Sequence, residues 1–143
     1  MPSSFSEQTV FAEQLVSLAS GNIKLVVFDS MTSLYREELA TTKEVFRANR
    51  ELNRQLGFIK EAAASHGFPA LILSQVYSVV DAEEPSVIPV SSRLLSYWSD
   101  IVLRLDPASP TGVRMACLEK PRRSPTRWMF RIGATGLIDL GLA

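Results

Sequence analysis

Asp29 and Gln75 each stand at the end of an apolar run in this 143-residue sequence, where a polar side chain could serve a phosphorylated ligand. A carboxylate at the C-terminal end of a buried parallel strand lies where open α/β sheets bind their ligands. There Asp29, assisted by Ser30, could hold Mg²⁺ beside a nucleotide, commonly through water. An aspartate that only caps a strand end or starts a turn fits the same pattern, so both interpretations stay open.

Two further positions carry groups that suit phosphate. Gln75 is expected beside Asp29 in space and could sense a terminal phosphate, although a polar strand end that bonds its own turn is the simpler alternative. Lys120 and Arg122 lie at another strand end and in the turn after it, which Pro121 stiffens. A rigid basic turn suits a nucleotide or a nucleic acid backbone, but a solvated charge run has the same composition.

The apolar pattern predicts the elements that must position Asp29 and Gln75. The segments Ile23–Ser30 and Ala70–Gln75 are nearly unbroken apolar runs, which is typical of parallel strands buried on both faces. Between them, residues 42–66 have the apolar stripe of a long helix, and Gly67 is placed as its C-terminal cap. Strand, helix and strand together predict one right-handed crossover of an α/β sheet.

The flanking segments predict further elements. Ser4 and Glu7 have capping-box spacing at the start of an N-terminal helix. The acidic stretch Val76–Pro89 predicts a loop, and a short helix is expected around Ser91–Ser99. Pro/Gly/Ser turns then separate three expected strands of an antiparallel meander, Asp100–Asp106, Val113–Lys120 and Arg127–Gly133. We therefore expect residues 1–143 to form one α/β domain.

Composition limits the classes of protein that fit. Fifteen basic and fifteen acidic residues balance, so any binding to nucleic acid must come from local patches. The single cysteine, Cys117, is expected to pack in a strand and fits a reducing compartment. No apolar run reaches the roughly 20 residues that span a bilayer, and no signal peptide is evident. The sequence therefore predicts a soluble, cytoplasmic protein without a membrane partner.

The order of these segments is similar to a known family. Residues 25–38 resemble the Walker B strand of RecA/RadA recombinases and the start of the first DNA loop, and Leu73–Val76 resembles the family's strand ending in Asn-Gln-Val, with Ser74 in place of the asparagine. The remaining matches are Ile101–Asp106, Arg114–Arg123 and Phe130–Ile132. The chain is thereby identified as an archaeal RadB-like member of the RecA/RadA recombinase ATPase family. The resemblance covers essentially the whole chain and implies the C-terminal part of a RecA-like P-loop NTPase core.

The resemblance implies a function in DNA repair and homologous recombination, with ATP and Mg²⁺ as cofactors. It implies that Asp29 is the magnesium-side acid, with Ser30 beside it, and that Gln75 senses the γ-phosphate. It implies that Lys120 and Arg122 reach a nucleotide held by a neighbouring subunit. The implied DNA loops are Arg36 to Lys43 and Val76 to Val90, with Arg36 and Lys43 as the candidate DNA-binding residues.

The sequence departs from the family in ways that bear on activity. It has no G-x-x-x-x-G-K-[ST] phosphate loop, and the family's catalytic glutamate lies upstream of Met1. Without the central strand that carries that loop, we expect a fragment of a longer product, or a sheet closed by re-pairing or self-association. Little ATP hydrolysis by this chain alone is expected. A non-catalytic module that docks on a recombinase and a fragment of a KaiC-like signalling ATPase are the alternatives.

Overall fold

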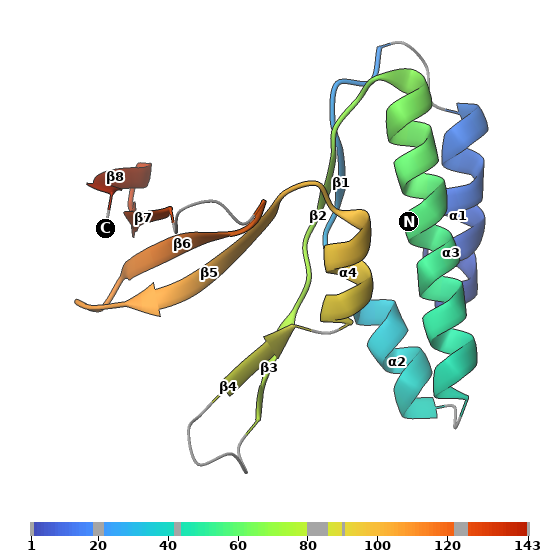
Figure 1. The fold of residues 1–143 in the computed structure, drawn as a ribbon, viewed down its shortest axis with the longest axis horizontal. Helices are drawn as coiled ribbons and strands as arrows, with labels where there is room; N and C mark the ends of the chain where they lie inside the picture. Colours follow the sequence, from blue (N-terminus) through green and yellow to red (C-terminus); the bar gives the residue numbers. More distant parts are fainter. Residues whose placement is uncertain are drawn as a thin grey trace. The chain divides into compact units, whose positions relative to one another are not determined.

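The structure, a computed structural model, describes residues 2–18, 22–41, 44–79, 86–89, 91–121 and 126–142. These residues form two compact units, 1–98 and 99–143 (Figure 1). That residues 1–143 form one domain stays a prediction. The fold class is confirmed: a parallel two-stranded sheet with a crossover helix comes first in the chain, and an antiparallel four-stranded sheet follows.

The first unit holds the described helices and two small sheets. In chain order its elements are α1 (Phe5–Leu18), β1 (Val26–Phe28), α2 (Ser33–Thr41), α3 (Val45–His66), β2 (Ala70–Ile72), β3 (Val76–Val79), β4 (Ser86–Pro89) and α4 (Ser92–Trp98). Strands β1 and β2 pair in parallel, in register from Val26 with Ala70 to Phe28 with Ile72. Helix α3 lies between them in the chain, so the predicted crossover is confirmed.

Helix α1 begins as the capping-box spacing predicts, although its glutamate binds a different partner. The Glu7 backbone N–H donates to the Ser4 hydroxyl at 3.2 Å. The Glu7 carboxylate instead accepts from the backbone N–H of Ser3 at 2.8 Å and from the Ser3 hydroxyl at 2.9 Å. The backbone hydrogen bond, and then the hydroxyl, lower the pKa of Glu7, because both favour the charged carboxylate. Hydrogen bonds that join Glu7 to Ser3 and to Ser4 therefore fix the first turn of α1.

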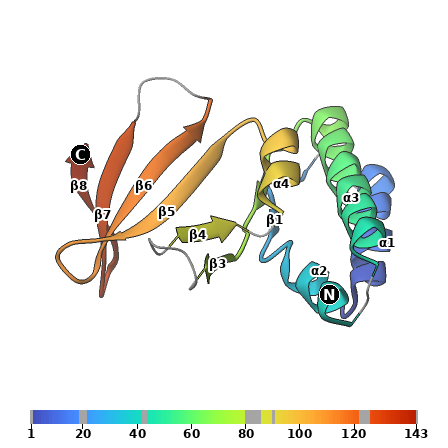
Figure 2. The ribbon, with the colours of Figure 1, turned by 60° about the horizontal axis from the view of Figure 1, so that its bottom comes forward.

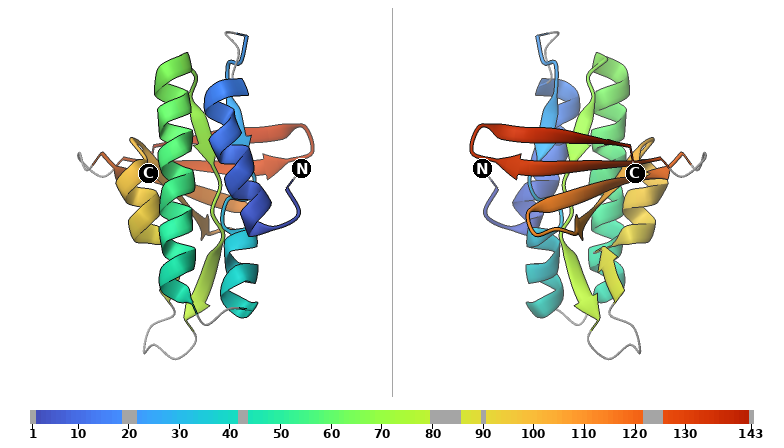
Figure 3. Two further views of the ribbon diagram at one scale, coloured as in Figure 1. Left: turned by 90° about the vertical axis from the view of Figure 1, so that its right-hand side faces the viewer. Right: turned by 90° about the vertical axis from the view of Figure 1, so that its left-hand side faces the viewer.

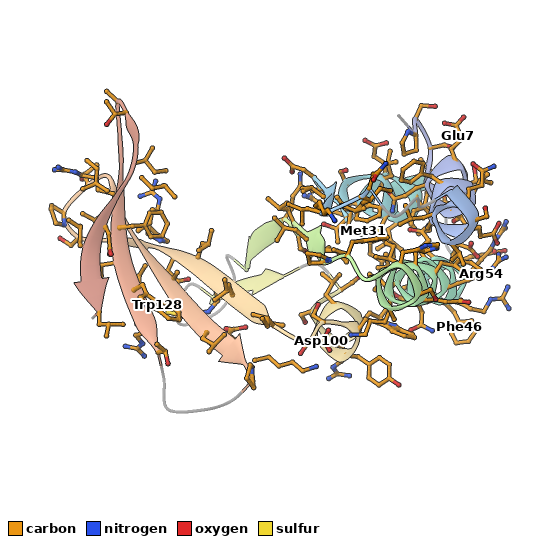
Figure 4. The ribbon with its side chains drawn as sticks, turned by 90° about the horizontal axis from the view of Figure 1, so that it is seen from above. Glu7, Met31, Phe46, Arg54, Asp100 and Trp128 are labelled. Atoms are coloured by element: carbon orange, nitrogen blue, oxygen red, sulfur yellow. The ribbon has the colours of Figure 1, made fainter. Side chains whose placement is uncertain are left out.

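The core of this unit forms where α3 packs on α1. The apolar stripe of α3 meets that of α1, and the two helices lie side by side (Figure 3, left). The buried apolar residues are Phe5, Ala12, Leu15, Met31, Tyr35, Ala48, Leu52, Leu56, Ile59, Ala62 and Phe68. In Figure 4, Met31 lies among the crowded side chains of this unit, whereas Phe46 lies at its outer side. Burial of this stripe, rather than helix propensity, is the main source of helix stability.

Gly67 ends α3 in the left-handed conformation that the sequence predicts. Its φ is 69° and its ψ is 32°, and its N–H donates to the Ala63 carbonyl oxygen at 3.0 Å. No heavy atom lies within 4 Å of where a Cβ on Gly67 would stand. A side chain there would therefore cost conformational energy without a clash.

We expect Gly67→Ala to lower the free energy of unfolding by about 1 kcal/mol, because alanine disfavours the left-handed region. Gly57→Ala is the matched control of opposite sign. Gly57 lies inside α3, and an added Cβ would meet the Trp98 ring at an ordinary 3.5 Å. It should stabilise by roughly 0.5–1 kcal/mol. Urea unfolding followed by far-UV circular dichroism measures both, and equal effects of the two variants would contradict this account of the cap.

Within the first unit the parallel sheet is covered on one face only, which corrects the prediction of strands buried on both faces. Helices α1 and α3 lie on the same side of β1 and β2 (Figures 1 and 3). The side chains that alternate to the other face stay open: Leu25 is 52% exposed, Val27 49%, Leu71 50% and Leu73 40%. The apolar runs indicated strands that have a partner on each face. Within the first unit, only one of those partners is present.

Two local predictions for this unit also need correction. Residues 33–41 form α2, where the resemblance implied the beginning of a loop; Tyr35 is buried there and donates to the Asn49 side-chain oxygen of α3 at 2.6 Å. A short polar helix such as α2 depends on tertiary contacts, and the sequence pattern does not predict them. The predicted loop Val76–Pro89 contains the strands β3 and β4, which pair antiparallel from Val76 with Pro89 to Val79 with Ser86.

The second unit is an antiparallel sheet of four strands in the order β5, β6, β7, β8 (Figure 2). The strands are Val102–Ala108, Val113–Lys120, Arg127–Gly133 and Gly136–Leu142. The first three confirm the predicted meander, and the fourth was not predicted. Gly133 pairs with Gly136 across a two-residue turn, Ala134-Thr135, that lacks the Asn-Gly or Asp-Gly signal of a tight hairpin.

Strand β6 occupies the interior of this sheet. Cys117 on β6 is buried, as predicted, with its thiol 3.8 Å from an Asp106 carboxylate oxygen. The Arg104 guanidinium of β5 donates to Glu119 of β6 at 2.7 Å. This hydrogen bond, above all, raises the pKa of Arg104, and the nearby charge of Asp106 adds to the effect. Arg104 therefore remains charged, and its hydrogen bond to Glu119 links β5 to β6 on an exposed face of the sheet.

Candidate functional site

The structure brings the segment after β1 and the segment after β2 to one edge of the parallel sheet. Main-chain hydrogen bonds continue past the strand ends, from Leu73 N–H to the Phe28 oxygen at 3.0 Å and from Met31 N–H to the Leu73 oxygen at 3.1 Å. Asp29 directly follows β1, and Gln75 lies three residues beyond β2. The carboxyl ends of parallel strands form the usual ligand-binding edge of such sheets.

Asp29 and Ser30 present the oxygen groups at this edge. The Asp29 side chain is exposed, and the peptide bond between Asp29 and Ser30 is cis. The Ser30 Oγ is buried and has no hydrogen-bond partner among the described residues. Buried hydroxyls nearly always have a partner, so this oxygen lacks a partner that a ligand group or a water could supply. Its backbone oxygen accepts from the Ser33 hydroxyl at 3.0 Å, which fixes the turn into α2.

This donor set fits Mg²⁺ of a nucleotide rather than an ion caged by protein alone. In the described part of the chain, no group of three or more His, Cys, Asp or Glu side chains is placed to hold a metal. Mg²⁺ usually keeps several waters and binds through one or two carboxylates together with the phosphates of its substrate. Asp29, with Ser30 beside it, matches that smaller requirement.

Thr32 is a functional candidate that the sequence reasoning missed. It is fully buried, and its hydroxyl accepts from the backbone N–H of Gln75 at 3.2 Å. The Ser74 hydroxyl lies 3.5 Å from the same oxygen. A threonine that follows an apolar strand carries no pattern of its own, and only the pairing of the two segments gives it this contact.

Arg36 of α2 contacts Gln75 directly. Its Nη1 donates to the Gln75 Oε1 at 2.9 Å, and both side chains are exposed. The family resemblance implied a DNA role for Arg36 and a nucleotide role for Gln75. The structure brings these two residues together at the same edge as Asp29.

The turn that carries Asp29 and Ser30 is anchored from behind by a buried polar network. The Gln8 side-chain amide of α1 donates to the Met31 backbone oxygen at 3.1 Å and to the Gln55 Oε1 at 2.7 Å. Gln55 of α3 donates in turn to the Thr9 hydroxyl at 2.7 Å and to the Phe5 oxygen at 3.3 Å. The edge of the sheet is thus tied to both covering helices.

Of the other predicted site residues, the structure describes Lys120 alone. Lys120 is half-buried at the end of β6 in the second unit, and its peptide bond to Pro121 is cis. Arg122 and Lys43 lie outside the described residues. Within the described residues, therefore, the structure brings together Asp29, Ser30, Gln75 and Arg36.

Parallel strands joined by a crossover helix, followed by an antiparallel sheet, make this an α/β protein of the kind that the resemblance to RecA-like cores implies. The sequence model of the Rad51 family matches residues 6–140. The chain therefore belongs to the Rad51 family of recombinases.

Individual relatives agree with this assignment. The chain is 34% identical to the DNA repair and recombination protein RadB of Thermococcus kodakarensis over 141 residues. These matched residues cover 97% of this chain and 61% of the relative. The chain is 32% identical over 138 residues to the protein of the same name from Methanococcoides burtonii, covering 95% and 60%. The crystal structure of the RadB recombinase matches with a TM-score of 0.71 and 31% identity, over 98% of this chain and 62% of that one. The chain thus spans about 60% of the length of these relatives.

The comparisons confirm the resemblance on which the sequence interpretation rested. They leave the roles of the individual site residues as predictions. In the part of the chain that the structure describes, no helix has the length and apolar character to cross a membrane.

Proposed function

We propose that this chain supplies the magnesium and γ-phosphate-sensing edge of an ATP site in a recombinase-type ATPase that acts on DNA in repair and recombination. The observation that carries the proposal is that the segments leading to Asp29 and Gln75 are hydrogen-bonded to each other at one edge of a parallel sheet. Membership of the Rad51 family supports ATP as the ligand of such an edge. The single, buried cysteine is consistent with action in the reducing cytoplasm.

In this proposal Asp29 holds a magnesium-bound water, and the Ser30 hydroxyl lies in the adjacent space. Mg²⁺ would neutralise charge that develops on the phosphate oxygens. Gln75 would donate from its side-chain amide to the terminal phosphate. Lys120 and Arg122 would bind a nucleotide on a neighbouring subunit, since a rigid basic turn can present its charges outward.

The 143-residue chain by itself should show no ATP hydrolysis, because it contains no phosphate-binding loop. Phosphate release with Mg²⁺-ATP, with and without single-stranded DNA, measures this. Asp29→Ala is the matched variant: its rate should equal that of the unchanged chain, at the background of the assay. Turnover by the unchanged chain that disappears in Asp29→Ala would overturn the prediction.

The DNA part of the proposal assigns phosphate contacts to Arg36 and Lys43. Binding to single-stranded DNA should then weaken with salt, with a slope of log K against log salt of about −0.7 for each phosphate neutralised. Because the net charge of the chain is +0, this binding would have to come from a local patch. A KaiC-like signalling ATPase is the alternative that would show no such binding.

A second candidate function is a non-catalytic module that docks on a recombinase. The open apolar face of β1 and β2 favours it, because four large side chains there are about half exposed. Pull-down with a purified recombinase, with and without ATP, separates the candidates. Docking without ATP would favour the module. Docking only with ATP, lost in Lys120→Ala, would favour a nucleotide bridged between the subunits.

A further inference from the structure

Gln75 is fixed at two points, by Thr32 directly before α2 and by Arg36 near the beginning of α2. Its backbone N–H donates to the buried hydroxyl of Thr32, and its side-chain oxygen accepts from Arg36. Thr32 and Arg36 are themselves joined, because the Arg36 backbone N–H donates to the Thr32 carbonyl oxygen at 3.1 Å. A single helical turn therefore holds both the main chain and the side chain of Gln75.

The contact with Arg36 fixes which end of the Gln75 amide faces outward. A guanidinium has only donors, so the amide atom facing it must be the oxygen Oε1. The Nε2 group, which has only donors, is then directed away from Arg36, and no described residue accepts a hydrogen bond from it. A phosphate oxygen has only lone pairs to offer, so the amide is oriented as a phosphate ligand requires.

We propose that Arg36 is a positioning residue that links DNA binding to nucleotide sensing. With its guanidinium on Gln75, Arg36 holds the amide with its NH₂ group toward the nucleotide edge. When a DNA phosphate binds the guanidinium, Gln75 is released to reorient. This inference rests on the proposed function, because it takes the DNA role of Arg36 and the phosphate role of Gln75 from there.

The chemistry of the contact allows such an exchange. Both side chains are exposed, and one N–H of the guanidinium is used on a neutral amide at 2.9 Å. Hydrogen bonds between two charged groups are about twice as strong as neutral ones, and phosphate accepts two guanidinium N–H groups at once. A DNA phosphate therefore competes well for Arg36. Thr32 keeps the Gln75 main chain in place throughout, since its hydroxyl is fully buried.

The first arm of the test needs neither nucleotide nor DNA. In ¹H–¹⁵N spectra of the 143-residue chain, the Gln75 side-chain amide, identified by its loss in Gln75→Ala, should be shifted from free glutamine. In Arg36→Ala it should move to the position of a free amide. Arg50→Ala is the charge-matched control, because Arg50 is exposed on α3 and should leave the Gln75 signal unchanged. An unchanged Gln75 signal in Arg36→Ala would overturn the positioning role.

The second arm adds an oligothymidylate of about 20 nucleotides, longer than usual single-strand site sizes. In the unchanged chain and in Arg50→Ala, DNA should move the Gln75 amide signal toward the free position. In Arg36→Ala, DNA should cause no further movement, and the salt slope of binding should fall by about 0.7, the value for one phosphate contact.

The outcomes separate this inference from the proposed function. DNA binding that leaves the Gln75 signal in place would overturn the link while sparing the DNA role. Absence of DNA binding by the unchanged chain would overturn the DNA part of the proposed function and the link with it. In that case the first arm still decides whether Arg36 positions Gln75.

Discussion

Gln55→Ala is expected to lower the free energy of unfolding of the first unit by about 3–5 kcal/mol. Gln55 has no exposed surface and takes part in three hydrogen bonds, with Gln8, Thr9 and the Phe5 backbone oxygen. Its removal leaves buried polar groups without partners, at roughly 1–3 kcal/mol each where no water enters, and opens a cavity as well. A loss of this size is a large part of the roughly 5–15 kcal/mol that stabilises a typical domain.

Gln14→Ala is the matched control, because Gln14 is an exposed glutamine on α1. It should change stability by less than about 0.5 kcal/mol. Urea unfolding followed by the helical circular dichroism signal reports on the first unit, which contains α1 to α4. A loss below about 1 kcal/mol in Gln55→Ala would show that water replaces the amide and that the network is not a main source of stability.

The same network connects stability to the candidate site. Gln8 donates both to Gln55 and to the Met31 backbone oxygen, two residues after Asp29. Loss of Gln55 removes one of these partners and loosens Gln8. We therefore expect the turn that carries Asp29 and Ser30 to lose protection from hydrogen exchange in Gln55→Ala before the unit unfolds as a whole.

Replacing both Val27 and Leu71 with threonine is expected to weaken self-association of the isolated chain by about 30-fold. The two residues are partners across β1 and β2 and are 49% and 50% exposed. A half-exposed side chain of this size retains about 1 kcal/mol of burial energy, and a pair of copies would bury four of them. Threonine keeps a methyl group, so the four replaced side chains of the two copies lose about half of their summed burial energy. This loss of roughly 2 kcal/mol corresponds to association that is about 30-fold weaker.

Sedimentation velocity over a range of concentrations measures this effect, and in a solution of this chain alone the available partner is a second copy. The control variant replaces Val45 and Phe46 with threonine, since these residues are 52% and 81% exposed on α3 and lie on another surface. It should leave association unchanged. A monomeric unchanged chain, with slow hydrogen exchange in both strands, would contradict the expectation of self-association.

The sequence predicted the parts of the fold whose signals are local. Gly67 as the cap of α3 could be read from a glycine after a periodic helix, and the structure gives it a φ of 69°. The positions of β1 and β2 followed from apolar runs that stop at polar residues, although β1 ends at Phe28 and β2 ends at Ile72, three residues before Gln75. Strand β8 was not predicted from the sequence. The turn before it has no characteristic turn residues, and its glycines interrupt the alternation of apolar and polar residues that indicates a strand.

What the sequence by itself determined is the family, the crossover and the acid and amide at the strand ends, since each depends on the order of residues along the chain. Only the tertiary structure decided that Thr32 and Arg36 hold Gln75, because these contacts join residues about 40 positions apart and leave no local pattern. It also decided that, within the first unit, β1 and β2 are covered on one face. An apolar run indicates that a strand needs partners on both faces, and which of them are present depends on how the chain packs.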